Sequence, residues 1–263
     1  MQRTISTWSD FKDAWDGVHN FLMAGECIPF AFDLPPLERI IEEVRRDPDA
    51  RITPGRKGRN LDFSSVAEQF RALPIDQAMR SEFGLAHFKL ENFYGAGQWL
   101  AGFREQVLLP WERALTAQGF TWDRCYPIVF ISGPGSASNY HMDFSHVVAW
   151  QRYGTKRFCG LKDPDRWAPR EMRVSYDPYQ NASPMPEGIR PEDQICYTMD
   201  PGDVLWNAFL TPHWVEAGDD VAMSFNLSHG GIRLAGRLCP FEQEYVDWVA
   251  TKPDLAATPV GRY

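Results

Sequence analysis

Two stretches of the sequence decide the expected fold: SNYHMDFSHVVAWQRYGTK at residues 138–156 and PGDVLWNAFLTPHWVE at residues 201–216. The first carries an imidazole and a carboxylate two positions apart, His141 and Asp143, and the second carries another imidazole, His213. At the end of an extended strand, residues i and i+2 point to the same face, so His141 and Asp143 can approach one ion. A distant strand lying alongside can bring His213 to the same point. The pattern therefore predicts a metal site made of these three side chains.

Short apolar segments surround these two stretches. We expect strands at residues 126–132, 147–153, 156–161, 195–199, 204–209 and 221–227, separated by turns that contain Gly or Pro. Residues 162–193 are irregular, and Pro184, Pro186 and Pro191 exclude a continuous central strand there. Many short strands with such turns are typical of a sandwich or jelly roll.

The first 120 residues have a different character. Apolar side chains recur at helical spacing over residues 7–23, over 37–44 after two prolines, and over 97–119, where Pro110 should kink or split the helix. We therefore expect residues 1–120 to form a mostly helical region packed on the core, 121–235 a jelly-roll core, and 236–263 a C-terminal helix and tail. The predicted fold class is mainly β with helical additions.

Composition excludes several classes of protein. The chain has 263 residues, of which 44% are hydrophobic, and its net charge of −8 argues against broad nucleic-acid binding. Neither a signal peptide nor a membrane span is indicated. Five widely spaced cysteines form no C-x-x-C pair, so neither a zinc site nor a disulfide framework is expected, and Cys159 is interpreted as a small apolar strand residue. We predict a reduced, cytoplasmic protein, monomeric or homodimeric.

Two histidines and one carboxylate on one face of a metal leave the other face open, which is typical of non-haem iron(II) oxygenases. A turn of sequence Pro-Gly-Asp before an apolar strand, followed by the Pro-His pair at 212–213, makes the pattern more specific than an isolated His-x-Asp. Residues 128–227 resemble the JmjC/cupin-like branch of the iron(II)- and 2-oxoglutarate-dependent dioxygenases, in particular the factor-inhibiting asparaginyl hydroxylase type. Residues 1–120 show no such resemblance.

The resemblance implies a double-stranded β-helix that uses Fe(II), 2-oxoglutarate as co-substrate and O2, hydroxylates a C–H bond and releases succinate and CO2. The family's catalytic metal ligands correspond to His141, Asp143 and His213. The lysine that pairs with the distal carboxylate of 2-oxoglutarate corresponds to Lys156, in a Gly-x-Lys-Arg turn. Further co-substrate contacts correspond to Ser138 and Asn226.

Two departures from the family pattern affect the co-substrate contacts. A polar residue that some members carry six positions after the first histidine is Val147 here. The loop between His213 and Asn226 is two residues shorter than in the asparaginyl hydroxylase, which weakens the assignment of Asn226. His146 is expected to pack beside the site or to hydrogen-bond a ligand.

The substrate is inferred only from what the chain lacks. A compact acidic enzyme without reader domains favours a small metabolite, amino acid or natural-product intermediate, and a peptide or protein side chain is the alternative. The basic loop with Arg51, Arg56, Lys57 and Arg59 suits an anionic substrate, although charge runs are more often solvated surface. Two other classes stay open: a non-catalytic metal-binding cupin, and a cupin enzyme without a keto-acid co-substrate.

Overall fold

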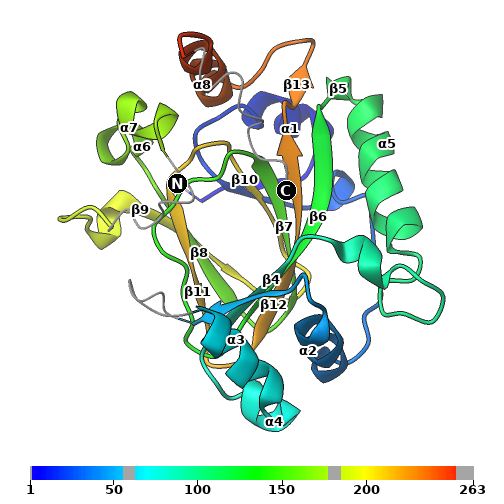
Figure 1. Ribbon diagram of the computed structural model, residues 1–263. Helices are drawn as coiled ribbons and strands as arrows, with labels where there is room; N and C mark the ends of the chain where they lie inside the picture. Colours follow the sequence, from blue (N-terminus) through cyan, green and yellow to red (C-terminus); the bar gives the residue numbers. More distant parts are fainter. Residues whose placement is uncertain (1, 56–62, 177–184, 253–263) are drawn as a thin grey trace.

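The computed structural model describes residues 2–55, 63–176 and 185–252, and its centre is a pair of mainly antiparallel sheets (Figure 1). In the described chain, the large sheet has eight strands in the order β1-β2-β10-β7-β12-β6-β4-β3, and a small sheet has the order β11-β8-β9. The large sheet consists of β1 Thr4–Ile5, β2 Phe21–Met23, β3 Arg51–Pro54, β4 Phe83–His87, β6 Arg124–Ser132, β7 His146–Tyr153, β10 Val204–Asn207 and β12 Ala222–Gly230. This arrangement confirms the predicted jelly roll.

The small sheet packs against the interior face of the large one. It consists of β8 Lys156–Leu161, β9 Gln194–Met199 and β11 His213–Ala217. Phe158 and Tyr197 from the small sheet form an apolar cluster with Leu205 from β10. A separate antiparallel pair, β5 Phe120–Thr121 and β13 Arg233–Leu234, lies at the end of the molecule where α8 is drawn (Figure 1). The interior between the sheets is therefore enclosed on two sides by strands.

Helices cover the other face of the large sheet, which explains why its central strands are apolar on both faces. In β7, residues 146–151 are all buried, because Val148 and Trp150 pack into the helical core while Val147 and Ala149 face the opposite way. The helices of the described chain are α1 Trp8–Ala14, α2 Leu37–Arg46, α3 Phe63–Ala72, α4 Ile75–Ala78, α5 Leu109–Ala117, α6 Pro164–Trp167, α7 Arg170–Val174 and α8 Pro240–Ala250, of which α6 and α7 lie on the small sheet instead. Shorter helical turns lie at Gly25–Cys27, Leu90–Phe93, Arg104–Leu108 and Pro191–Asp193.

The N-terminal region differs in part from the predicted helices. The helix expected over residues 7–23 ends at Ala14, and Phe21–Met23 instead forms β2, which pairs with β10. Pairing with a central strand buries Phe21 and Met23 more fully than a surface helix would. Pro110 lies in the first turn of α5, and the π-helical turn Arg104–Leu108 runs directly into that helix through Leu108 and Leu109, which both have right-handed helical φ and ψ. The segment is therefore not split at the proline, and a kink there stays a prediction. Whether residues 1–120 form a unit of their own stays a prediction.

The expectation that the cysteines form no disulfide is wrong. Cys159 in β8 and Cys196 in β9 are register partners, and their sulfurs are bonded. Antiparallel pairing brings these residues together across the irregular segment between them, a proximity that spacing along the chain does not reveal. Cys159 is fully buried, as expected of an apolar strand residue, but it also ties the two strands covalently.

The C-terminal helix confirms its prediction, since α8 starts at Pro240 and ends at Ala250. It lies at the opposite end of the molecule from α3 and α4 (Figure 1). None of the helices in the described ranges is long and apolar enough to cross a membrane.

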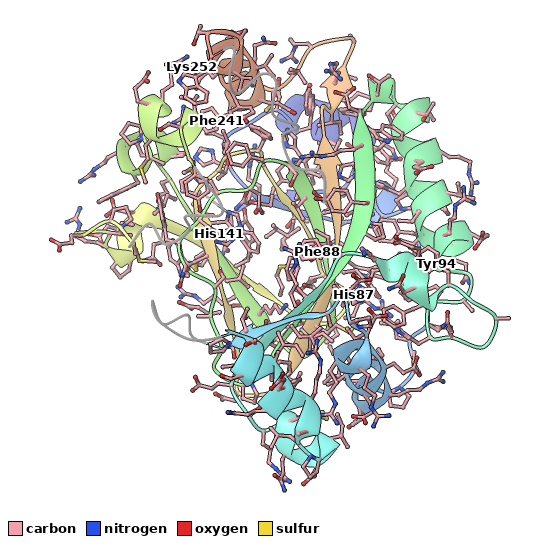
Figure 2. The ribbon with its side chains drawn as sticks, viewed as in Figure 1. His87, Phe88, Tyr94, His141, Phe241 and Lys252 are labelled. Carbon is pink, nitrogen blue, oxygen red and sulfur yellow. A yellow bond between two sulfur atoms is a disulfide. The ribbon has the colours of Figure 1, made fainter. Side chains whose placement is uncertain are left out.

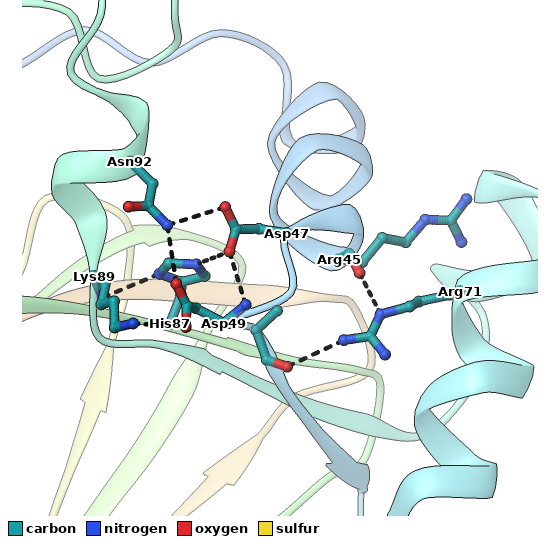
Figure 3. Close-up of polar contacts among 8 residues, drawn as sticks. Arg45, Asp47, Asp49, Arg71, His87, Lys89 and Asn92 are labelled. Carbon is teal, nitrogen blue, oxygen red and sulfur yellow. Dashed lines mark hydrogen bonds and ion pairs between the residues drawn. The ribbon is translucent and has the colours of Figure 1, made fainter.

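A polar network joins the end of α2 to the segment after β4 (Figure 3). The Nδ1 atom of His87 accepts a hydrogen bond from Lys89 N–H, so its Nε2 carries the ring proton, and that atom lies 3.0 Å from Asp47 Oδ1. Asn92 Nδ2 donates to both Asp47 and Asp49. Burial alone would raise the pKa of Asp47, but its contacts with His87, Asp49 N–H and Asn92 outweigh burial and lower that pKa.

We predict that Asp47→Ala lowers the free energy of unfolding by about 1–3 kcal/mol, because the buried His87 ring loses the carboxylate that lies 3.0 Å from its Nε2 and Asn92 loses an acceptor. The folded-state pKa of Asp47 lies below its unfolded value, so this stabilisation is present above pH ~4 and is lost as the pH falls through the folded pKa. Denaturant titrations at pH 7 and pH 3 measure both effects.

The matched control is Asp76→Ala, which removes an exposed carboxylate paired with Arg80 one helical turn away. Such an exposed ion pair contributes about 0–1 kcal/mol to the free energy of unfolding. Equal decreases in the free energy of unfolding for the two variants at pH 7 would contradict a stabilising role for the Asp47 network.

Candidate metal centre

The three predicted ligands meet at one end of the small sheet. His141 forms an isolated antiparallel bridge with His213: its N–H donates to the His213 carbonyl at 3.0 Å, and the His213 N–H donates back at 2.9 Å. Figure 2 labels His141 beside this sheet. His141 and Asp143 lie in the segment before β7, not at the end of a longer strand as expected. The bridge is therefore what brings the two imidazoles together, with ring centroids 4.2 Å apart.

The distances suit a single ion. His141 Nε2 lies 4.0 Å from Asp143 Oδ1, and His213 Nε2 lies 3.5 Å from Asp143 Oδ2. One donor atom from each residue falls within 4.8 Å of the others. The carboxylate thus faces both imidazoles, as two histidines and one acid around one metal require.

The tautomer of each histidine leaves its Nε2 atom available to bind a metal. His141 Nδ1 lies 2.6 Å from the Asn139 carbonyl, and His213 Nδ1 lies 2.9 Å from the Thr211 carbonyl. Because a carbonyl can only accept a hydrogen bond, each Nδ1 carries the proton and each Nε2 keeps its lone pair. Burial, followed by the neighbouring His141, lowers the pKa of His213 to about 4, so this ring is neutral at pH 7.

Exposure of the three side chains shows which side of the cluster is open. The side chain of His213 is 3% exposed, whereas those of His141 and Asp143 are 31% and 35% exposed. The ring of His213 also stacks on Phe158, at 5.0 Å between centroids. Two ligands are therefore reachable from solvent, and the third is fixed by the interior of the barrel.

Lys156 is a buried cation inside the barrel. Its residue is 5% exposed, and Nζ donates to the Phe130 carbonyl and to Ser224 Oγ, both at 3.2 Å. Within the described ranges no carboxylate forms an ion pair with it, and burial lowers its pKa to about 7. A buried ammonium without a counter-ion is unfavourable. An anionic ligand would supply the missing charge, as the sequence pattern predicts for Lys156.

Ser138 and Asn226 lie on two different walls. Ser138 Oγ accepts a hydrogen bond from Val215 N–H at 2.8 Å, which joins the segment before the ligands to β11. Asn226 pairs with Ala149 and Ile128 across the large sheet, and its Oδ1 is buried with no donor among the residues the structure describes. Their contacts with a co-substrate stay predictions.

Sequence reasoning missed Asn207. This residue ends β10, and its Nδ2 donates to Asp143 Oδ2 at 3.1 Å. The signal was a polar side chain inside the apolar run Val204–Phe209, which was interpreted only as a strand.

A second group of possible ligands, made of His146, Cys239 and Glu242, is also buried. The Phe209 N–H donates to His146 Nδ1 at 3.3 Å, so in the neutral ring the proton is on Nε2, the atom 3.7 Å from Glu242 Oε2. A protonated Nε2 cannot ligate a metal. His146 therefore faces α8 from the helical side of the sheet and does not hydrogen-bond a predicted ligand side chain.

The segments expected to wall the pocket are described in part. The Arg51 guanidinium lies over the Phe88 ring, 4.4 Å from its centroid, while Arg56, Lys57 and Arg59 lie outside the described residues. In the 162–193 segment, α6 and α7 pack on the outer face of the small sheet, where Tyr140 O–H donates to the Trp167 carbonyl.

Comparison with known proteins gives a match at the level of structure alone. No family model matches the sequence, and no curated protein matches it. The Escherichia coli ribosomal oxygenase YcfD in complex with cobalt and 2-oxoglutarate is similar with a TM-score of 0.52 at 14% identity, over 99% of this chain and 60% of that chain. The complex with cobalt and succinic acid gives 0.51 at 15% identity, over 99% and 59%.

Another crystal structure of the Escherichia coli ribosomal oxygenase YcfD has a TM-score of 0.52 at 15% identity, over 99% of this chain and 70% of that chain. This chain spans about 60% of the length of most of these similar structures. The likeness covers the region before residue 120 as well as the core. The chain therefore shares its fold with this ribosomal oxygenase, and the jelly roll that the sequence resemblance predicted is confirmed.

Proposed function

We propose that this protein is an iron(II)- and 2-oxoglutarate-dependent hydroxylase. The observation that carries the proposal is the joint presence, in one barrel, of a three-residue cluster that can hold a metal, open on one side, and a buried lysine that has no carboxylate partner among the described residues. A metal alone would explain the first feature, and an anionic co-substrate would supply the counter-charge that supports the second.

In this proposal His141, Asp143 and His213 hold the metal through two Nε2 lone pairs and one carboxylate. When bound, iron(II) with 2-oxoglutarate would supply O2 activation coupled to formation of succinate and CO2. Lys156 would pair with the distal carboxylate of 2-oxoglutarate, with Ser138 and Asn226 as further contacts. The barrel wall around His213 and Lys156 excludes water from the inner end of the site.

The proposed substrate is a side chain of a protein. The similar solved structures are of a ribosomal oxygenase, so the alternative that the sequence left open gains support, and a ribosomal protein is the first substrate to test. The prediction of a small-molecule substrate receives no support from these comparisons. The cytoplasmic location stays a prediction.

Anaerobic titration with iron(II) and then 2-oxoglutarate tests the proposal without knowledge of the substrate. We expect a weak visible charge-transfer band that needs both components. Iron(II) binding with no band on addition of 2-oxoglutarate would instead favour a metal-binding cupin or a cupin enzyme without a keto acid.

Asp143→Ala should weaken cobalt(II) binding by more than the roughly 10–100-fold typical of losing an outer-sphere partner, because a direct ligand is removed. Its side chain is 35% exposed, but truncation leaves the buried Nδ2 of Asn207 without its acceptor, so the melting temperature of the metal-free protein should also fall. Isothermal titration and thermal melting measure the two effects. Glu242→Gln is the matched control, and equal loss of cobalt binding in that variant would show that the metal occupies the other cluster.

Lys156→Met should raise the 2-oxoglutarate concentration needed for the charge-transfer band at least tenfold, because a buried charge pair of about 1.4 kcal/mol or more is lost. Lys162→Met, which removes an exposed lysine just after β8, should leave that concentration unchanged. An unchanged 2-oxoglutarate requirement in Lys156→Met would remove the assignment of this residue.

A further inference from the structure

The side chain of Asn207 is hydrogen-bonded on one side only. The residue is 1% exposed, and its Nδ2 donates to Asp143 Oδ2 at 3.1 Å. Its Oδ1 is buried and has no donor in the part of the chain that the structure describes. An unpaired buried acceptor destabilises a fold. A residue selected for packing alone would not carry this amide.

The backbone after Asn207 is held from three directions. Ala208 N–H donates to Asn20 Oδ1 at 3.1 Å, and Phe209 N–H donates to His146 Nδ1 at 3.3 Å. Leu210 N–H donates to the Asp143 carbonyl at 2.9 Å. These three contacts come from the N-terminal region, from β7 and from the ligand segment, so Asn207 has little freedom to move away from Asp143.

The same turn contains a strained residue. Leu210 has a φ of 49°, a left-handed conformation that is unfavourable for a side chain branched at Cγ. Its N–H reaches the backbone of Asp143 in that conformation, while Asn207 reaches the carboxylate. Backbone and side chain of Asp143 are therefore both fixed by one turn.

The contact selects one orientation of the carboxylate. Asp143 Oδ2 receives the amide and faces His213 Nε2 at 3.5 Å, while Oδ1 is turned toward His141 at 4.0 Å. Because this side chain is partly exposed, water would otherwise allow it to rotate about its last torsion. A hydrogen bond from a fixed amide holds an exposed ligand in the orientation that the two imidazoles need.

We propose that Asn207 is a positioning residue that orients Asp143 for metal binding at the expense of fold stability; this inference rests on the function proposed above. The proposal predicts opposite effects of a substitution on the stability of the metal-free fold and on metal affinity. Removing the amide should improve or preserve the stability of the metal-free fold and should weaken metal binding. A structural role would instead lower stability and leave binding by the folded protein unchanged.

The test uses Asn207→Leu, which keeps the branching at Cγ and the number of side-chain heavy atoms and removes both polar groups. We expect the melting temperature of the metal-free protein to stay equal or rise, the cobalt(II) Kd to increase about tenfold or more, and the visible cobalt absorption of the bound form to change because Asp143 is reoriented. Thermal melting and anaerobic cobalt titration give all three readouts without turnover.

Asn92→Leu is the matched control, since it also removes an amide that donates to carboxylates, far from the site, at Asp47 and Asp49. Its cobalt Kd and absorption spectrum should equal those of the wild type. Wild-type cobalt affinity and spectrum in Asn207→Leu, or a lowered melting temperature with normal binding by the folded fraction, would overturn the positioning role. Failure of the wild-type protein to bind cobalt would instead overturn the proposed function itself.

Discussion

The backbone bridge between His141 and His213 is the contact on which the candidate site depends. Two hydrogen bonds of 3.0 and 2.9 Å hold the segment before β7 against the start of β11, which places the two ring centroids 4.2 Å apart. The carbonyls of Asn139 and Thr211 then set the tautomers. A slip of one residue in this pairing would turn one imidazole to the other side of the small sheet and remove the ligand set.

The barrel separates a dry helical face from a polar interior. One face of the large sheet packs on helices through residues such as Trp150 and Phe225, while the other carries Ser224, Asn226 and Asn207 toward the small sheet. Polar groups in such a position destabilise a fold unless they are paired. Among the described residues, Lys156 has no carboxylate partner and the Oδ1 atoms of Asn226 and Asn207 have no donor, which is typical of a site built for a ligand and not for stability.

The elements predicted well were those with local signals. The apolar runs of β6 to β10 and of β12 alternate with Gly and Pro turns, and the start of α8 at Pro240 follows ordinary helix chemistry. The elements predicted poorly depend on distant partners. The sequence of Phe21–Met23 fits a helical pattern, but the segment forms a strand because it can hydrogen-bond to β10. Cys159 and Cys196 come together only because β8 and β9 pair in that register.

By itself the sequence determined the strand-rich core, the residues of the candidate metal cluster and the placement of Lys156 directly after a turn, because residue types and short spacings are local properties. Tertiary structure alone decided that His141 pairs with His213 outside any long strand, that Lys156 is buried with no carboxylate partner in the described chain, and that Asn207 contacts Asp143. Each of these depends on which backbone atoms become hydrogen-bond partners when segments distant in the chain are brought into register, and no local pattern encodes that choice.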